Sequence, residues 1–180
     1  MGAARASALA LGDDVFVVNS FSKYFNMTGW RLGWLIAPAD FIPMIDRLAQ
    51  NIFLAASTPA QHAALAAFAP STLEILERRR ALLEDRRNFL LEAVRELGFT
   101  LPLTPQGAFY LYADCSGLCA NSSELAATLL DEAGVAITPG LDFGTYRATD
   151  HVRFSYTTAM ENLQIGVERL RKYLAKIPKR

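Results

Sequence analysis

The order of hydrophobic and polar residues along this chain predicts an α/β protein. Residues 15–19 form a short run without alternation, so we predict a strand that is buried on both faces, and the apolar run 34–37 is predicted to be a second strand. After them, apolar residues recur at helical spacing over 41–54, 60–69 and 71–97. The first half of the chain is therefore expected to hold two strands followed by three helices.

The longest predicted helix, 71–97, is expected to join two lobes. It opens with a capping box at Ser71 and stops before Gly98. Leucines recur along it every seven residues, as in a coiled coil. The charged residues Arg80 and Arg87 occupy the other core position of the heptad, so we expect packing along one stripe rather than a coiled coil. We place the boundary between the lobes at residues 84–85.

Beyond Gly98 the pattern predicts an α+β unit. Runs rich in aromatic and β-branched residues indicate short strands, and caps at Asn121 and Thr158 mark the starts of two helices. The predicted strands are 99–103, 108–112, 135–138 and 151–156, and the predicted helices are 122–133 and 158–176.

Composition and charge exclude several classes of function. Of 180 residues, 18 are basic and 18 are acidic, so the formal charge is zero and neither a nucleic-acid footprint nor a polybasic membrane surface is expected. No apolar run approaches the roughly 18 to 20 residues of a membrane span. The first residues lack the apolar segment of a signal peptide, so we expect a cytoplasmic protein.

The two cysteines, Cys115 and Cys119, are interpreted as free thiols in a reducing compartment. A zinc site would need two further ligands nearby, and the histidines, His62 and His151, are distant in the sequence. No metal site is expected.

The chemistry is concentrated between the first two predicted strands. Ser20 and Ser22 can donate to a phosphate, and the planar fork of Arg31 matches a phosphate dianion. Lys23, near that positive centre and partly desolvated, is expected to favour its neutral, nucleophilic amine, which forms a Schiff base with an aldehyde. An aldehyde that also carries a phosphate is pyridoxal 5′-phosphate (PLP).

The complete string Ser-Phe-Ser-Lys-x-x-x-Met-Thr-Gly-Trp-Arg-Leu-Gly-Trp resembles the lysine segment of the class I/II, fold-type I PLP-dependent aminotransferases. The resemblance covers about sixteen contiguous positions. It implies that Lys23 is the Schiff-base lysine and that Ser20, Ser22 and Arg31 hold the cofactor phosphate. Gly29 and Gly33 within the string are expected to allow close backbone approach.

Further matches to the same family lie far from the lysine. Residues 139–144 resemble its Pro-Gly-x-x-Phe-Gly segment. The Val-Arg-Phe-Ser sequence resembles the strand whose arginine, here Arg153, binds the substrate α-carboxylate, and a guanidinium suits that group. The Gly-Ala-Phe-Tyr strand resembles one that borders the active site, which makes Phe109 a candidate substrate contact.

The resemblance implies a specific architecture and activity. Residues 1–84 are expected to be the C-terminal part of the large PLP-binding domain and residues 85–180 a small α+β domain. The expected reaction moves an amino group between an α-amino acid and a 2-oxo acid, with Lys23 as the general base and acid. A homodimer is expected from the resemblance alone.

The chain departs from the family in one large respect: Lys23 lies close to its start, whereas related enzymes have about half their chain before that lysine. The family's contacts to the pyridine nitrogen and ring, and its glycine-rich phosphate loop, belong to that part. We therefore expect a truncated chain and keep three hypotheses: part of a working transaminase, a non-catalytic remnant with weak PLP binding, or a carbon–sulfur lyase or synthase of the same fold.

Overall fold

A computed structural model describes residues 7–176 of the chain. The chain divides into two compact units, Met1–Arg80 and Ala81–Arg180, and the division falls within one long helix. Each unit has a hydrophobic cluster of its own.

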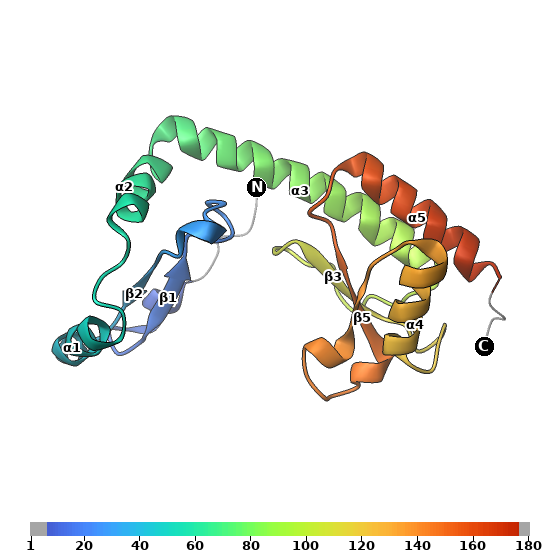
Figure 1. Cartoon of the computed structure of the whole chain (residues 1–180), viewed down its shortest axis with the longest axis horizontal. Coiled ribbons are helices and arrows are strands. Elements are labelled where there is room, and N and C mark those ends of the chain that lie inside the picture. Colours follow the sequence, from blue (N-terminus) through green and yellow to red (C-terminus); the bar gives the residue numbers. More distant parts are fainter. Residues whose placement is uncertain (1–6, 177–180) are drawn as a thin grey trace. The chain divides into compact units, whose positions relative to one another are not determined.

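The first unit contains a pair of antiparallel strands and two short helices (Figure 1). Strand β1 pairs with strand β2, so that Val17 faces Ile36 and Ser20 faces Gly33. The first part of helix α3 also belongs to this unit. The bounds are Val17–Ser20 for β1, Gly33–Ile36 for β2, Ile42–Ile52 for α1, Thr58–Ala67 for α2 and Pro70–Glu96 for α3.

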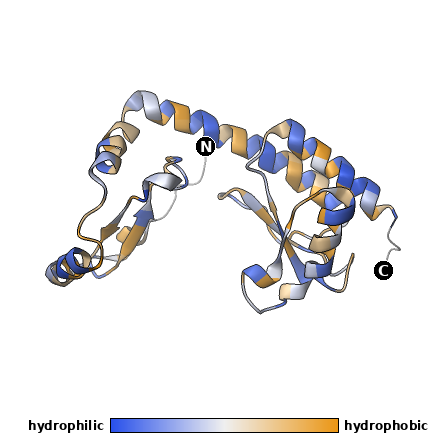
Figure 2. Ribbon diagram, viewed as in Figure 1, coloured by the Kyte–Doolittle hydropathy of each residue, from blue (hydrophilic) through white to orange (hydrophobic). Residues whose placement is uncertain are grey.

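Strand β1 is not buried on both faces, so that prediction is wrong for the described residues, and strand β2 is exposed as well. Val18 is 79% exposed and Leu35 is 42% exposed. Each strand nevertheless carries two aliphatic residues, Val17 and Val18 in β1 and Leu35 and Ile36 in β2, and Figure 2 shows both hydrophobic and hydrophilic colours along the pair. A sheet of only two strands cannot cover its own faces, so these apolar side chains remain accessible to solvent.

The core of the first unit lies between the β1–β2 connection and α2. Phe21 and Met27 of the connection are buried together with Ala64 and Ala67 of the helix. The small alanine side chains let the helix approach the connection closely. Proline in the first turn of α2 suits a helix start, as the sequence predicted.

The second unit is built on a three-stranded antiparallel sheet with the strand order β3-β5-β4. Helix α4 continues without a break into a π-helical turn, η4, which ends at Gly134 in the left-handed conformation. The bounds are Tyr110–Asp114 for β3, Ser122–Thr128 for α4, Leu129–Ala133 for η4, Thr138–Pro139 for β4, His151–Ser155 for β5 and Met160–Leu174 for α5 (Figure 1).

The core of the second unit joins one face of the sheet to the helices. Side chains that alternate along β3 and β5 point into it, and leucines and valines from α3, α4, η4 and α5 complete it. Complete burial of one such aliphatic side chain contributes about 1.5–3 kcal/mol. Hydrophobic residues of this core with no exposed surface include Val94, Leu111, Ala113, Cys115, Leu129 and Val152.

The predicted helices are confirmed, with shifts of a few residues at their ends. Helix α3 ends before Gly98, which has a positive φ of 95°, and the side chain of Asn121 caps α4 by accepting from Ser123 N. The cap predicted at Thr158 is wrong, because α5 begins after Ala159. The long helix predicted at 71–97 corresponds to α3, but α3 begins at Pro70, so Ser71 lies within the helix and the capping box predicted there is wrong.

The strand predictions in the second unit are less accurate. Residues 99–103 form only one bridge, between Thr100 and Asp114, instead of a strand. The strand predicted at 108–112 begins at Tyr110, because Ala108 has a left-handed φ of 63° that ends extended structure. Strand β5 confirms the last predicted strand. No helix among residues 7–176 is long and apolar enough to span a membrane.

Candidate functional site: the lysine loop and the arginine strand

Three predicted cofactor residues, Ser22, Lys23 and Arg31, lie in one loop, the lysine loop, which we define as residues 21–32 between β1 and β2, and the fourth, Ser20, is the last residue of β1. Its base is closed by the pairing of Ser20 with Gly33 and by a hydrogen bond of 3.0 Å from Phe21 N to Leu32 O. Both ends of the loop are therefore fixed by main-chain pairing, and the lysine segment between them is held as one unit.

A series of hydrogen bonds links the predicted phosphate-binding residues. The Ser22 amide donates to Ser20 Oγ at 3.0 Å, the Thr28 hydroxyl donates to the Ser22 carbonyl at 2.7 Å, and Arg31 Nη1 donates to the Thr28 carbonyl at 3.0 Å. Thr28 is thus the link between the serines and the arginine. We assigned it no role from the sequence, although it belongs to the string that carries the resemblance.

Aromatic side chains pack against one another at the start of the loop. The Phe21 ring lies 4.8 Å from Phe25, 5.0 Å from Trp34 and 5.7 Å from Phe68, measured between ring centroids. Edge-on contacts of this kind add to the energy of simple burial. The aromatic residues of the string thus have a structural role, since they hold the polar residues in place.

Lys23 is exposed to solvent. The partial desolvation that we predicted for its amine is therefore wrong for the described part of the chain. The next residue is anchored, because the Tyr24 hydroxyl donates to Glu77 Oε1 on α3 at 2.7 Å. The carbonyl of Lys23 accepts from Asn26 N at 3.0 Å, which forms a tight turn around the lysine.

The two loop glycines differ in their surroundings. A Cβ atom on Gly33 would lie 2.5 Å from the Asn19 carbonyl oxygen, so close backbone approach requires glycine there. A Cβ on Gly29 would meet nothing within 4 Å among the described residues, so a close approach of a ligand to Gly29 stays a prediction.

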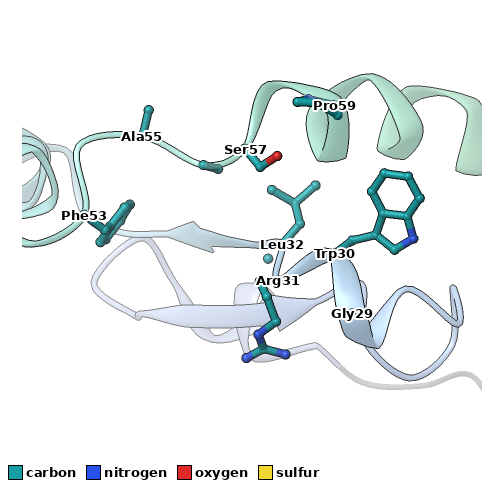
Figure 3. A pocket seen from close by; sticks show the side chains of 10 residues that line it. Gly29, Trp30, Arg31, Leu32, Phe53, Ala55, Ser57 and Pro59 are labelled. Carbon is teal, nitrogen blue, oxygen red and sulfur yellow. The ribbon is translucent and has the colours of Figure 1, made fainter.

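A pocket of about 860 Å³ adjoins the loop, between β2 and the segment that leads into α2. In Figure 3 the Leu32 side chain extends toward Ser57, whereas the Arg31 guanidinium extends in the opposite direction. The pocket is lined mainly by apolar residues and glycines, and the charged end of Arg31 does not point into it. Arg31 is nevertheless one of its lining residues, so the pocket borders the hydrogen-bonded phosphate-binding residues.

Arg153 and Phe109, the predicted substrate residues, lie in the second unit. Arg153 is in the central strand β5, where it faces Tyr112 on one side and Thr138 on the other. Its Nη2 donates to Thr138 Oγ1 at 3.2 Å, and its Nε is buried with no hydrogen-bond partner among the described residues. A buried donor without a partner is costly, which makes this nitrogen a candidate contact for a ligand.

Aromatic rings frame the guanidinium of Arg153. Its Cζ lies 4.9 Å from the centroid of Phe143 and 5.7 Å from that of Tyr110. These cation–π contacts help to hold the planar group in place. Phe143 belongs to the Pro-Gly-x-x-Phe-Gly segment, so the sequence contained the signal for this contact, although we gave Phe143 no role.

Phe109 is half-buried and packs against the hydrophobic core of the second unit. Its ring contacts Tyr110 edge-on at 5.9 Å, and its carbonyl accepts from Tyr156 N at 3.0 Å. These contacts give Phe109 a packing role at the start of β3, and its contact with substrate stays a prediction.

An ionic network fixes the end of the same sheet. Arg147 bridges two carboxylates, Asp114 and Asp150, each at 2.9 Å. Burial raises the pKa of the Asp114 carboxyl, but hydrogen bonds from Ser116 and Arg147 outweigh it and leave that pKa below its ordinary value. His151 stacks on Tyr112 at 4.9 Å, and its Nδ1 lies 2.9 Å from the Arg147 carbonyl.

Comparison with known proteins decides the family. A family model for class I and II aminotransferases matches residues 1–170. The chain belongs to the class I and II aminotransferase family. Enzymes of this family depend on PLP, as the resemblance of the lysine loop implied. The predicted fold is confirmed as well, since solved aminotransferases match the model closely.

Three matches illustrate the relationship. The chain is 37% identical to the valine–pyruvate aminotransferase of Mycobacterium tuberculosis, over 89% of the chain and 42% of that protein. It is 37% identical to an aspartate aminotransferase of Geobacillus stearothermophilus, over 88% of the chain and 40% of that protein. A crystal structure of an aminotransferase from Mycobacterium tuberculosis superposes with a TM-score of 0.92 at 36% identity, covering 96% of this chain and 44% of the other. The chain thus spans less than half the length of these relatives.

The residues of the lysine loop fit a phosphorylated aldehyde cofactor. Ser20, Ser22 and Arg31 supply hydroxyl and guanidinium donors, and one hydrogen-bonded series connects them in the loop that also presents the amine of Lys23. Charge-assisted donors of this kind suit a phosphate. No cluster of three or more potential metal ligands occurs among the described residues.

Proposed function

We propose that this chain contributes the cofactor-binding lysine, the phosphate-binding residues and the carboxylate-binding arginine of a PLP-dependent aminotransferase. The observation that carries the proposal is the hydrogen-bonded lysine loop, which gathers Ser20, Ser22 and Arg31 around the Lys23 turn. Membership of the class I and II family supports the same reaction class.

Each loop residue has a defined part in the proposal. When bound, PLP supplies an electron sink for bonds at the substrate α-carbon. The Arg31 guanidinium and the hydroxyls of Ser20 and Ser22 would hold its phosphate, and Lys23 Nζ would hold its aldehyde. Once released, the Lys23 amine would carry a proton to and from the substrate α-carbon as general base and acid.

Arg153 would bind the α-carboxylate that amino acid and 2-oxo acid substrates share. Its buried Nε has no hydrogen-bond partner among the described residues, and a carboxylate would satisfy it with a charge-assisted bond. Phe143 and Tyr110 restrict the guanidinium, so less entropy would be lost when the substrate binds.

Further polypeptide of the aminotransferase fold is proposed to complete the enzyme. The chain spans 42% of its Mycobacterium tuberculosis relative, and β1 and β2 expose side chains such as Val18 and Leu35. Large apolar surfaces of this kind are usually covered in a working protein. We also propose a homodimer, from the family resemblance, and a cytoplasmic location, which the free thiols Cys115 and Cys119 support.

Cofactor attachment gives a direct test. Purified protein is mixed with PLP, reduced with borohydride, and mapped by peptide mass spectrometry for the modified lysine. We expect labelling at Lys23, and we expect it to disappear in Lys23→Ala but persist in the surface control Lys172→Ala. Equal labelling of both lysines in the wild type would contradict a specific site. In the isolated chain we expect slow, weak attachment and no transamination.

A non-catalytic remnant is the second candidate, and the exposure of Lys23 favours it for the isolated chain. Amino-group transfer, assayed with and without co-expressed sequence encoded upstream of residue 1, distinguishes the two. Robust transfer by these 180 residues alone would contradict the fragment interpretation. A carbon–sulfur lyase or synthase would instead form its products without transferring an amino group to a second 2-oxo acid.

A further inference from the structure

The two cysteines of the chain lie together on one turn that follows β3. Cys115 has no exposed surface and Cys119 is half-buried, and their Sγ atoms are 3.6 Å apart. The amides of Leu118 and Cys119 both donate to the Cys115 carbonyl, at 2.9 and 3.0 Å. This single turn therefore holds both thiols in van der Waals contact.

The surroundings of the two thiols differ. Both the amide and the thiol of Cys115 donate to the Asp150 carbonyl, at 2.7 and 3.2 Å respectively. Burial raises the pKa of the Cys115 thiol, and the adjacent Cys119 raises it further. Cys119 is the more accessible of the two, so an oxidant from solvent meets its sulfur first.

We propose that Cys115 and Cys119 form a redox-active dithiol that hydrogen peroxide converts to an intramolecular disulfide. The Cys119 thiolate attacks the peroxide O–O bond, takes one oxygen to become a sulfenic acid, and releases hydroxide, which is protonated to water. The Cys115 sulfur then attacks the sulfenic sulfur, forms the S–S bond, and expels the oxygen as a second water. Two thiols lose two electrons and two protons in total, and one peroxide is reduced.

The turn can accommodate this bond with little movement. A disulfide is about 2.05 Å long, so the sulfurs must approach by roughly 1.5 Å. Gly117, between the cysteines, has no atoms near its missing Cβ, which leaves the turn room to adjust. The Cys115 amide keeps its bond to the Asp150 carbonyl, and only the thiol contact to that oxygen is lost. The sheet that carries Arg153 therefore stays intact.

Graded peroxide treatment tests the proposal. The reduced protein is exposed to hydrogen peroxide, its remaining thiols are alkylated, and its mass is measured before and after peptide digestion. We expect the free thiols of Cys115 and Cys119 to disappear in a one-to-one ratio. The peptide that contains both cysteines should become lighter by two hydrogen atoms. Dithiothreitol should restore both thiols.

Two variants separate the steps. In Cys119→Ser, the buried Cys115 should resist peroxide. In Cys115→Ser, Cys119 should be trapped by dimedone as a sulfenic acid and should then proceed to the irreversible sulfinic form. If Cys115→Ser does not fold, the results for the wild type and Cys119→Ser still test the proposed disulfide. Sulfinic Cys119 beside unreacted Cys115 in the wild type, or disulfides formed only between chains, would overturn the proposal.

Discussion

The hydroxyl of Tyr24, the residue after Lys23, donates to Glu77 on α3 at 2.7 Å. The contact ties the lysine turn to a helix that lies more than fifty positions along the chain. Glu77 also accepts from Arg80 at 2.6 Å, so its carboxylate is itself oriented. Tyr24 occupies a position that the matched string leaves unspecified. The string therefore could not predict that Tyr24 positions the lysine turn.

Replacing Tyr24 with phenylalanine should loosen the lysine turn while keeping the ring contact to Phe25. A hydrogen bond to a charged group at a partly exposed site contributes about 1 kcal/mol. We therefore expect faster amide hydrogen exchange in peptides covering residues 21–27. Tyr146→Phe, at an exposed position in the other unit, is the control and should leave those peptides unchanged. Unaltered exchange in Tyr24→Phe would show that the Glu77 contact does not hold the turn.

Gly33→Ala should disrupt the base of the lysine loop. The new methyl group would meet the Asn19 carbonyl at 2.5 Å, and relieving such a clash costs about 1–3 kcal/mol. Gly29→Ala, in the same loop, adds its methyl to open space and should be nearly neutral. Urea unfolding with a probe in the first unit, such as Trp34 fluorescence, compares the two. Equal stability of both variants would contradict the close approach of β1 and β2.

Arg153→Met should leave the second unit at least as stable as the wild type. The substitution removes a buried donor without a partner, and apolar replacement of a buried charge is often neutral or stabilising. The lost contacts with Phe143 and Tyr110 reduce this gain. Arg147→Met should behave oppositely, because it leaves Asp114 and Asp150 without their shared partner. If Arg153→Met lowered the free energy of unfolding by more than about 1 kcal/mol, a role of Arg153 confined to ligand binding would be refuted.

The acid stability of the second unit should depend on Asp114. Its pKa is lower in the folded state than in the unfolded state, so its stabilising contribution is complete above the unfolded value. That contribution decreases as the pH falls through the folded pKa. Asp114→Asn should therefore lower stability near neutral pH and differ progressively less from the wild type in acid. Urea unfolding at a series of pH values tests this, and a difference independent of pH would count against the carboxylate.

Local signals predicted most of the helices and the family, whereas tertiary contacts decided the rest. Gly98 and Asn121 mark helix ends through their own backbone and side chain, so the sequence was sufficient there. The burial of Val18 depends on what packs over the β1–β2 pair, and its exposure among the described residues could not be predicted from the run of apolar residues. Thr28 and Thr138 acquire roles only through residues that folding brings beside them.

The closed base of the lysine loop has a consequence for engineering. Because Ser20 faces Gly33 across a strand pair, the two ends of the loop are held about 5 Å apart whatever lies between them. The residues at its tip can therefore be exchanged with those of a related aminotransferase as one cassette. The anchors to retain are Phe21 and Met27, whose burial against α2 seats the cassette on the rest of the first unit.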